Sequence, residues 1–448
     1  MLFKMAKFSK AFSVRNLLVL SLSINVSLLV RVAFERHENG LTGFYMASQK
    51  EPLAAHATHP SLSSSSTVAA GDGDRVINLD HGDPTMYERF WQQMGDKATI
   101  VIPGWQFMSY FSDIGNICWF LEPEFARQIV RLHKVVGNAV TAERYIVVGT
   151  GSTQLYQAVL YALAPQDADE PISVVTAAPY YSSYPTITDC LKSGLYKWAG
   201  DARSFEKKGP FIELVTSPNN PDGYARQSVL NRSEGILVHD LAYYWPQYTP
   251  ISSPADHDIM LFTVSKSTGH AGMRIGWALV KDREVAQKMI KYIELNSIGV
   301  SKDSQLRAAK ILKVVSDSCE SSGDSSESLF EFAYHLLAER WQLLREAVQH
   351  NGLFSLPSFS SGFCNYLERS FEPQPAFAWL KCEEPIKDCQ EFLRSSRILT
   401  RSGKHFGVGP QYVRISLLDR DDTMNLFIER LSNITIDKAY EHLKERGD

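Results

Sequence analysis

The sequence has few cysteines, and their spacing excludes two kinds of site. Six cysteines are spread over 448 residues, and no two of them form a Cys-x-x-Cys pair. A zinc site or a dense disulfide framework needs clustered cysteines, so neither is expected, and no other metal site is predicted. An excess of positive charge is also absent. The net charge is −4, so nucleic acid is not a predicted partner.

The glycine fingerprint of dinucleotide-binding folds is absent too. Gly149-Thr-Gly-Ser-Thr-Gln154 follows an apolar run, but it lacks the third glycine of G-x-G-x-x-G. A nicotinamide or flavin dinucleotide site is therefore disfavoured. The hydrophobic content of 44% and the charged content of 21% are ordinary for a globular protein. A chain of this length accommodates two domains, each with its own core.

One long apolar run lies near the N-terminus. Residues 17–34 are apolar apart from Arg31 and small polar residues, and basic residues precede them. The run is near the minimum for a membrane-spanning helix, roughly 17 to 20 residues. A single-pass anchor over residues 1–35 and a cleaved targeting peptide both fit. The lack of a nearby Ala-x-Ala site favours the anchor. Residues 36–75 are rich in serine and predict a flexible linker.

Apolar runs and helical patterns alternate through the middle of the chain. Each apolar run reads as a short buried strand, and polar motifs follow the strand ends; the runs are 145–148, 172–177, 211–216, 235–239 and 259–262. This pattern predicts an α/β fold with a mostly parallel sheet and ligands at the carboxyl ends of its strands. The predicted domains are an N-terminal arm with part of the small domain (76–115), a large domain (116–325) and a small α+β domain (326–448).

Lys266 comes soon after the apolar run 259–262. Burial disfavours the charged form of a lysine and lowers its pKa, and a neutral amine can attack a carbonyl to form a Schiff base. The hydroxyls of Thr263 and Ser265 and the guanidinium of Arg274 can hold a phosphate beside it. This combination suggests pyridoxal phosphate. Taken alone, the same stretch also fits a surface lysine in a glycine-rich loop.

Other strand ends carry residues that suit the same cofactor. Ser152 and Thr153 stand where a glycine-rich turn enters a helix, which predicts an anion site. Tyr181 follows the run 172–177 and can stack on a flat ring, although a core tyrosine is the alternative. Asp240 ends another strand, and a buried carboxylate needs a partner such as a protonated pyridine nitrogen. Arg414 lies among apolar residues and needs a carboxylate from the protein or a substrate.

Six motifs occur in one order along residues 76–435, and together they carry a resemblance; they are Gly82-Asp-Pro-Thr85, Gly149-Thr-Gly-Ser-Thr153, Ser217-Pro-Asn-Asn-Pro-Asp-Gly223, His239-Asp-Leu-Ala-Tyr-Tyr-Trp245, Ser265-Lys266 with Gly269-His-Ala-Gly272, and Val413-Arg-Ile-Ser416. The chain resembles fold type I pyridoxal-phosphate enzymes of the aspartate aminotransferase superfamily. Within that superfamily it resembles the alliinase C-terminal domain family, and most of all the plant tryptophan aminotransferase-related proteins.

The resemblance implies a role for each candidate residue. Lys266 binds the cofactor as a Schiff base and later moves the proton between the substrate and the cofactor. Asp240 pairs with the pyridinium nitrogen, and Tyr181 stacks on the ring. Asn220 and Tyr243 bond the ring hydroxyl. The phosphate is held by Ser152, Thr153, Thr263 and Arg274. Tyr87 reaches the phosphate across a homodimer interface, and Arg414 clamps the substrate carboxylate.

The choice of reaction rests on one departure from the alliinases. Those enzymes carry a cysteine-rich, EGF-like segment before the catalytic domain, whereas residues 36–117 hold no cysteine. The anchor-like N-terminus instead resembles the branch of the tryptophan aminotransferase relatives that is anchored in the endoplasmic reticulum membrane, and the resemblance implies the same location here. Together these features favour an L-tryptophan–pyruvate aminotransferase that makes indole-3-pyruvate for auxin biosynthesis. The substrates are then an amino acid and a 2-oxo acid. The alternative is an alliinase-type C–S lyase acting on S-alkylcysteine sulfoxides. Lys266, Asp240 and Arg274 argue against a non-catalytic scaffold.

Overall fold

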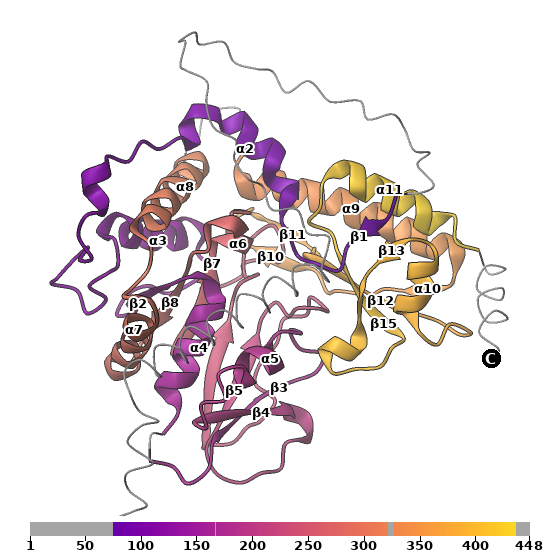
Figure 1. Cartoon of the computed structure of the whole chain (residues 1–448). Helices are drawn as coiled ribbons and strands as arrows, with labels where there is room; N and C mark the ends of the chain where they lie inside the picture. The colour runs from indigo at the N-terminus through magenta and orange to yellow at the C-terminus, as the bar shows by residue number, and fades with distance from the viewer. Residues whose placement is uncertain (1–74, 166, 321–326, 436–448) are drawn as a thin grey trace, which may run out of the picture. The chain divides into compact units, whose positions relative to one another are not determined.

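The computed structural model describes residues 75–165, 167–320 and 327–435. Its centre is a seven-stranded sheet in the order β2-β8-β7-β6-β5-β3-β4 (Figure 1). The strands are β2 (Tyr145–Gly149), β3 (Ile172–Thr176), β4 (Tyr196–Asp201), β5 (Phe211–Thr216), β6 (Gly235–Asp240), β7 (Ile259–Thr263) and β8 (Gly276–Val280). The five neighbouring strands β4, β3, β5, β6 and β7 pair in parallel, and β8 pairs antiparallel with both β7 and β2. The predicted α/β class and mostly parallel sheet are confirmed.

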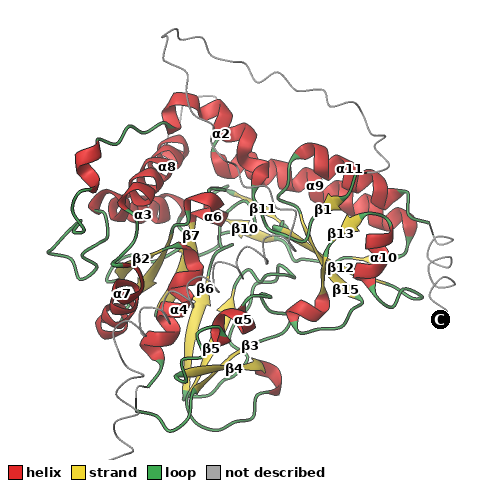
Figure 2. Ribbon diagram, in the orientation of Figure 1, coloured by secondary structure: helices red, strands yellow, loops and turns green. Residues whose placement is uncertain are grey.

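The sheet forms because its strands are apolar on both faces. Every residue of β3, β5 and β7 is buried, which is typical of a parallel sheet covered by helices. The described part of the large domain contains the helices α3 (Pro123–Val136), α4 (Gly151–Leu163), α5 (Tyr184–Asp189), α6 (Val264–Ser267), α7 (Arg283–Ser297) and α8 (Lys302–Glu320). Helix α4 packs against α7 and β8, and α3 packs against α8. Figure 2 shows these helices around the strands.

The start of one helix matters for function. The sequence predicts that a glycine-rich turn enters a helix near Ser152 and Thr153, and α4 begins at Gly151. Ser152 and Thr153 therefore lie in its first turn, where backbone N–H groups are without helical acceptors. Strand β8 was not anticipated from the sequence. It fills the position between β2 and β7, the strand that precedes Lys266.

The C-terminal part is built on a four-stranded antiparallel sheet, β14-β15-β12-β9. Its strands are β9 (Phe354–Ser355), β12 (Phe377–Cys382), β14 (Arg401–Ser402) and β15 (Tyr412–Ser416), and its helices are α9 (Leu329–Asn351), α10 (Cys389–Ser395) and α11 (Asp421–Ser432). A capping box at Ser328 and Glu331 starts α9. Two smaller pairs are β10 (Gly362–Cys364) with β11 (Arg369–Phe371) and β1 (Ile77–Asn78) with β13 (Ile398–Leu399).

The β1–β13 pair brings the start of the described chain to the C-terminal sheet, and helix α2 (Glu88–Met94) follows it. The residue limits of the two domains stay a prediction. Two of the six cysteines, Cys382 and Cys389, form a disulfide. The bond links the end of β12 to the start of α10.

The predicted localisation, a single-pass protein of the endoplasmic reticulum membrane, is corrected by the structure. Within the described residues, none of the helices has the length and apolar character needed to cross a membrane. The segment proposed as the anchor, residues 1–35, lies outside the described residues, and so do residues 36–74 of the predicted linker.

Candidate active site

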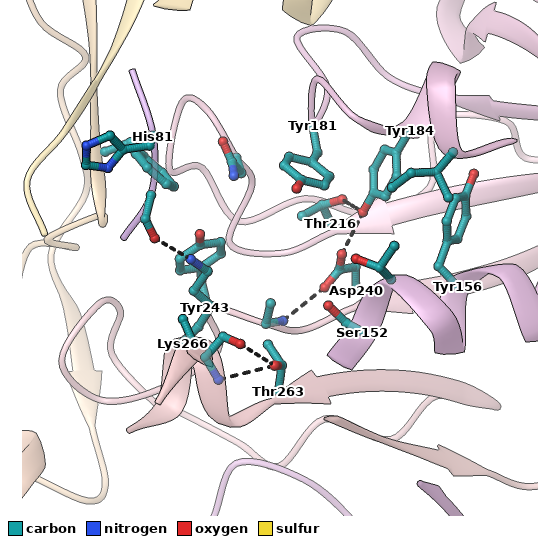
Figure 3. A pocket seen from close by; sticks show the side chains of 18 of the residues that line it. His81, Ser152, Tyr156, Tyr181, Tyr184, Thr216, Asp240, Tyr243, Thr263 and Lys266 are labelled. Atoms are coloured by element: carbon teal, nitrogen blue, oxygen red, sulfur yellow. Dashed lines mark hydrogen bonds between the residues drawn. The ribbon is translucent and has the colours of Figure 1, made fainter. Parts of the chain in front are cut away.

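Nearly all the predicted site residues meet in one cavity. It has a volume of about 340 Å³ and lies at the carboxyl ends of the parallel strands, with walls from both sheets (Figure 3). The structure brings together Ser152, Thr153, Tyr181, Asn220, Asp240, Tyr243, Thr263, Ser265, Lys266, Arg274 and Arg414 in its lining. These residues come from widely separated parts of the sequence, so the parallel topology accounts for their meeting.

Lys266 projects into this cavity from the short helix α6. Thr263 ends β7 and caps α6, since its side chain accepts a hydrogen bond from Ser265 N–H. The Lys266 Nζ donates to the carbonyl oxygen of Gly82 at 2.7 Å. Burial lowers the pKa of Lys266 to about 8, with a further decrease from the positive charge of Arg414. A much larger fraction of this amine is neutral near pH 7 than for an ordinary lysine, as nucleophilic attack on a carbonyl requires.

Asp240 is the last residue of β6 and also lines the cavity. Its Oδ2 accepts a hydrogen bond from the Tyr184 hydroxyl at 2.7 Å, and its Oδ1 accepts from Ala242 N–H at 3.1 Å. Part of the carboxyl faces the cavity, and protein encloses the rest, so burial raises its pKa. Within the described residues, no basic side chain forms an ion pair with it. A carboxylate enclosed in this way fits the protonated ring nitrogen of a pyridoxal cofactor.

The predicted anion site corresponds to the N-terminus of α4. Thr150, the residue before the helix, makes no side-chain cap, so the first N–H groups stay available, and Ser152 and Thr153 add hydroxyls. Arg274 lies against the same turn. A Cβ added to Gly151 would come within 2.6 Å of the Arg274 Nη2. The uncapped helix end, the hydroxyls and the guanidinium together fit a phosphate group.

This close approach gives a testable prediction for Gly151→Ala. Gly151 has φ +73°, and the new methyl group would displace the Arg274 guanidinium. We expect cofactor affinity to fall by about tenfold or more, since a charged hydrogen bond contributes about 1.5–3 kcal/mol. The measurement is the dissociation constant of pyridoxal phosphate for the cofactor-free protein.

Gly137→Ala is the matched control. Gly137 has φ +70°, but a Cβ there meets no atom within 4 Å. Both substitutions carry the backbone strain of a left-handed residue, of order 1 kcal/mol, but only the one at 151 touches the anion site. Equal loss of cofactor affinity in the two variants would contradict the assignment of the phosphate site.

Arg414 lies on β15 in the floor of the cavity. Its Nη1 donates to Asn220 Oδ1 at 3.1 Å, its Nη2 donates to the carbonyl oxygen of Asp80 at 2.7 Å, and its Nε has no partner among the described residues. Burial lowers its pKa to about 10, far above neutral pH, so the guanidinium stays charged. In the described part of the chain, no acidic side chain forms an ion pair with it. A substrate carboxylate is then the partner that fits.

The remaining predicted residues line the walls between these charges. Asn220 gives its amide oxygen to Arg414, which leaves its NH2 group as a donor for another acceptor. The ring of Tyr243 faces Lys266, with the Nζ at 5.8 Å from its centre. Tyr181 makes an edge contact with Tyr184, with ring centres 5.3 Å apart. Their roles toward the cofactor ring stay predictions.

Tyr87 is the one predicted site residue that the structure does not place in the cavity wall. Its ring is 1% exposed and packs against the position of Gly269. Its hydroxyl bonds the hydroxyl of Tyr248 at 2.9 Å and accepts from Gln247 Nε2 at 3.1 Å. The side chain is thus enclosed in its own chain, and the reach of Tyr87 to a phosphate across a dimer interface stays a prediction.

Sequence reasoning missed several residues of the cavity. Tyr184, Thr216, Phe377 and Arg401 all line it. Arg401 lies directly opposite Arg414 on the paired strands β14 and β15. The nearness of Tyr184 to Tyr181 along the chain was a weak signal for Tyr184, and Thr216 stands at the end of a predicted strand. No signal marked Phe377 or Arg401. Their positions depend on strand pairing rather than on a local motif.

Most of the chain matches known proteins. The family model Alliinase_C, described as "Allinase", matches residues 77–435. The Arabidopsis thaliana protein named "Tryptophan aminotransferase-related protein 2" is 60% identical over 436 residues, covering 96% of this chain and 99% of the relative. "Alliin lyase" from Allium cepa var. aggregatum is 40% identical over 351 residues, covering 76% of this chain and 77% of that enzyme.

Several solved structures of aminotransferases have a similar fold. A probable N-succinyldiaminopimelate aminotransferase from Thermus thermophilus has a TM-score of 0.57 at 18% identity, covering 80% of this chain and 94% of its own. An aspartate aminotransferase double mutant from Thermus thermophilus has a TM-score of 0.56 at 16% identity, covering 80% and 91%. The fold is therefore that of the fold type I transferases that use pyridoxal phosphate.

Proposed function

Because this chain belongs to the alliinase family, whose cofactor is pyridoxal phosphate, we propose that it is an L-tryptophan–pyruvate aminotransferase making indole-3-pyruvate for auxin biosynthesis. The observation that carries the proposal is the pairing in one cavity of a lysine of lowered pKa with a buried arginine that has no acidic partner among the described residues. The 60% identity to a relative named for tryptophan aminotransferase supports the choice of amino acid.

The cavity offers a distinct group to each part of the cofactor. Lys266 would hold it covalently, Asp240 would bind the ring nitrogen, and the turn at Gly151 with Arg274 would bind the phosphate. Tyr181 would cover the ring, and the Asn220 amide and the Tyr243 hydroxyl would bind its hydroxyl group. When bound, pyridoxal phosphate supplies an electron sink for the bond broken at the α-carbon of an amino acid.

The chain's own residues supply orientation and proton transfer. Arg414 would hold the α-carboxylate of tryptophan, and later that of pyruvate, because both acids carry the same group. Phe377 lies against the Arg414 guanidinium, with the ring centre 4.1 Å away, and adds an apolar wall. Once released from the cofactor, the Lys266 amine would take the proton from the substrate α-carbon and deliver it to the cofactor. Its lowered pKa suits both directions of transfer.

A C–S lyase of the alliinase type is the second candidate. The observation that favours it is the 40% identity to proteins named alliin lyase over three quarters of the chain. A lyase would use the same lysine, aspartate and arginine, so these residues do not separate the two reactions. In the lyase reaction the β-substituent of the substrate leaves. In the aminotransferase reaction the proton returns at the cofactor, which then carries the amino group.

Product analysis separates the two reactions. The full-length protein loaded with pyridoxal phosphate is incubated with L-tryptophan and pyruvate, and separately with an S-alkylcysteine sulfoxide. The proposal predicts indole-3-pyruvate and alanine in equal amounts from the first mixture. Pyruvate and a sulfenic acid from the sulfoxide, with no alanine from tryptophan, would establish the lyase instead.

We also propose that the chain is a homodimer, as the sequence resemblance implied. The segment 101–114 exposes a cluster of large apolar side chains, namely Val101, Trp105, Phe107, Met108, Tyr110, Phe111 and Ile114. Monomeric proteins rarely expose apolar clusters of this kind. A second copy of the chain is the occupant that the proposal assigns to this surface.

The surface gives a prediction for the double variant Met108→Glu with Ile114→Glu. These side chains are 85% and 83% exposed, so the change does not disturb the core of one chain. Two carboxylates buried in an apolar interface cost several kcal/mol, so we expect a monomer at micromolar concentration. Light scattering after size-exclusion chromatography gives the mass. Leu191→Glu, at an exposed leucine elsewhere, should stay a dimer, and a dimeric double variant would exclude this surface.

A further inference from the structure

Two hydroxyl groups in the cavity wall, those of Thr216 and Tyr184, form a hydrogen-bonded chain that ends at Asp240. Thr216 ends β5 and lies directly opposite Asp240 in the register of β5 and β6. Tyr184 is the first residue of α5, and its hydroxyl lies between the two, at 2.8 Å from Thr216 Oγ1 and 2.7 Å from Asp240 Oδ2 (Figure 3). Tyr184 is 3% exposed and Thr216 is 4% exposed, so bulk water does not compete for these bonds.

The proton positions in this chain follow from valence. An ionised carboxylate can only accept, and a tyrosine hydroxyl has one proton to give. The Tyr184 proton is therefore on the bond to Asp240, and the Tyr184 oxygen accepts the proton of Thr216. The bonds point in one direction, from Thr216 through Tyr184 to the carboxylate. Hydrogen bonds aligned in this way polarise one another and stabilise the negative charge at the end.

The two hydroxyl groups stabilise the negative charge of Asp240, which burial would otherwise disfavour. Burial raises the pKa of Asp240, while the bonds from Tyr184 and from Ala242 N–H lower it. Burial also raises the pKa of Tyr184 well above its ordinary value, with a further increase from the negative charge of Asp240. Tyr184 thus keeps its proton at every working pH and remains a donor.

We propose that Tyr184 is a positioning residue, which keeps Asp240 ionised and aimed at the cofactor so that the ring nitrogen stays protonated. This inference rests on the proposed role of Asp240 as the partner of that nitrogen. Thr216 completes the arrangement by fixing the Tyr184 hydroxyl. Tyr184 itself needs no contact with the substrate or the reacting atoms.

A neighbouring tyrosine provides the matched control. Tyr156 lines the same cavity, and its ring centre is 5.2 Å from that of Tyr184. Its hydroxyl bonds Thr188 rather than Asp240. Both Tyr184→Phe and Tyr156→Phe remove one buried hydroxyl and keep the ring, so packing losses are similar. Only the first removes a hydrogen bond to the carboxylate.

The experiment compares the full-length wild type with Tyr184→Phe, Tyr156→Phe and Asp240→Asn. The first readout is the dissociation constant of pyridoxal phosphate for each cofactor-free protein. The second is the pH midpoint of the absorbance change of the bound cofactor. For Tyr184→Phe we expect affinity about tenfold or more weaker, the effect of losing a hydrogen bond to a charge. Tyr156→Phe should stay within about twofold of the wild type.

The midpoint should move upward in Tyr184→Phe. Without the Tyr184 bond, the Asp240 carboxylate is less stable, so the ring nitrogen carries less positive charge. Because less positive charge then lies near it, the Lys266 nitrogen is easier to protonate. A shift of about one pH unit corresponds to the tenfold effect. A role in packing alone leaves the midpoint where it is, so this second readout separates positioning from structure.

Each outcome either supports or overturns the proposed role of Tyr184. An unchanged midpoint and affinity in Tyr184→Phe, or equal changes in both tyrosine variants, would overturn it. If Asp240→Asn behaves as the wild type, the proposed role of Asp240 fails as well. If Asp240→Asn is impaired and Tyr184→Phe is not, only the inference about Tyr184 fails. Should Tyr184→Phe not fold, Thr216→Val takes its place: an upward midpoint shift supports the inference, and no shift overturns it.

Discussion

Replacing Lys266 with methionine is expected to abolish turnover and to make the cofactor-free protein more stable. Turnover should fall by at least about 1,000-fold, because both the covalent link and the proton carrier are lost. Burial lowers the pKa of Lys266 from 10.5 to about 8, which costs the folded state about 3 kcal/mol at neutral pH. The lost bond to the Gly82 carbonyl offsets about 1 kcal/mol, which leaves a gain of about 2 kcal/mol.

The stability gain expected for Lys266→Met should depend on pH. Between about pH 8 and 10.5 the unfolded chain binds a proton at Lys266 that the folded chain does not, so wild-type stability rises with pH in that window. The extra stability of Lys266→Met over the wild type is therefore fully present below about pH 8, and it disappears as the pH approaches 10.5. Denaturant unfolding of both cofactor-free proteins measures it. A variant that is less stable than the wild type at pH 7 would contradict the account of Lys266 as a buried amine.

Replacing Arg414 with glutamine is expected to lower kcat/KM for tryptophan by about 100- to 1,000-fold. The loss corresponds to about 3–4 kcal/mol, in the range for removing one partner of a buried charge pair. Arg414→Lys keeps the charge but loses the paired geometry of the guanidinium, so about a tenfold loss is expected. The KM for pyruvate should rise in parallel, because the two carboxylates would occupy the same position in turn.

Tryptamine supplies the control for Arg414. It has the indole ring and the amine of tryptophan but no carboxylate, so it should react equally slowly with the wild type and with Arg414→Gln. Steady-state and single-turnover kinetics on both compounds give the comparison. If Arg414→Gln reduces the reaction of tryptamine as much as that of tryptophan, then Arg414 acts on the cofactor or the fold, and its assignment to the substrate carboxylate is wrong.

The sequence revealed the part of the site that depends on local pattern. A short apolar run followed by a polar residue is a local signal, and it located Asp240 and Lys266 at strand ends that the structure places in one cavity. The glycine-rich turn before α4 was visible in the same way. Parallel strands bring their carboxyl ends to one edge of the sheet, so these separate signals could be combined into one site.

Features that depend on pairing between distant segments were not visible. The bond from Tyr184 to Asp240 spans 56 residues, and no periodicity reports it. Tyr87 follows a turn motif, but its burial depends on Tyr248, 161 residues away. Strand β8 follows the loop of Lys266 directly and is antiparallel, so the alternating strand–helix pattern did not predict it. The disulfide between Cys382 and Cys389 depends on how β12 and α10 approach each other.

The central claim is that this cavity holds pyridoxal phosphate on Lys266, and one measurement tests it directly. The loaded full-length protein is treated with borohydride, which makes the bond between cofactor and lysine permanent, and is then digested and analysed by mass spectrometry. The account predicts the phosphopyridoxyl group on the peptide that contains Lys266, in close to one equivalent per chain. A group found on another lysine, or none on any peptide, would contradict it.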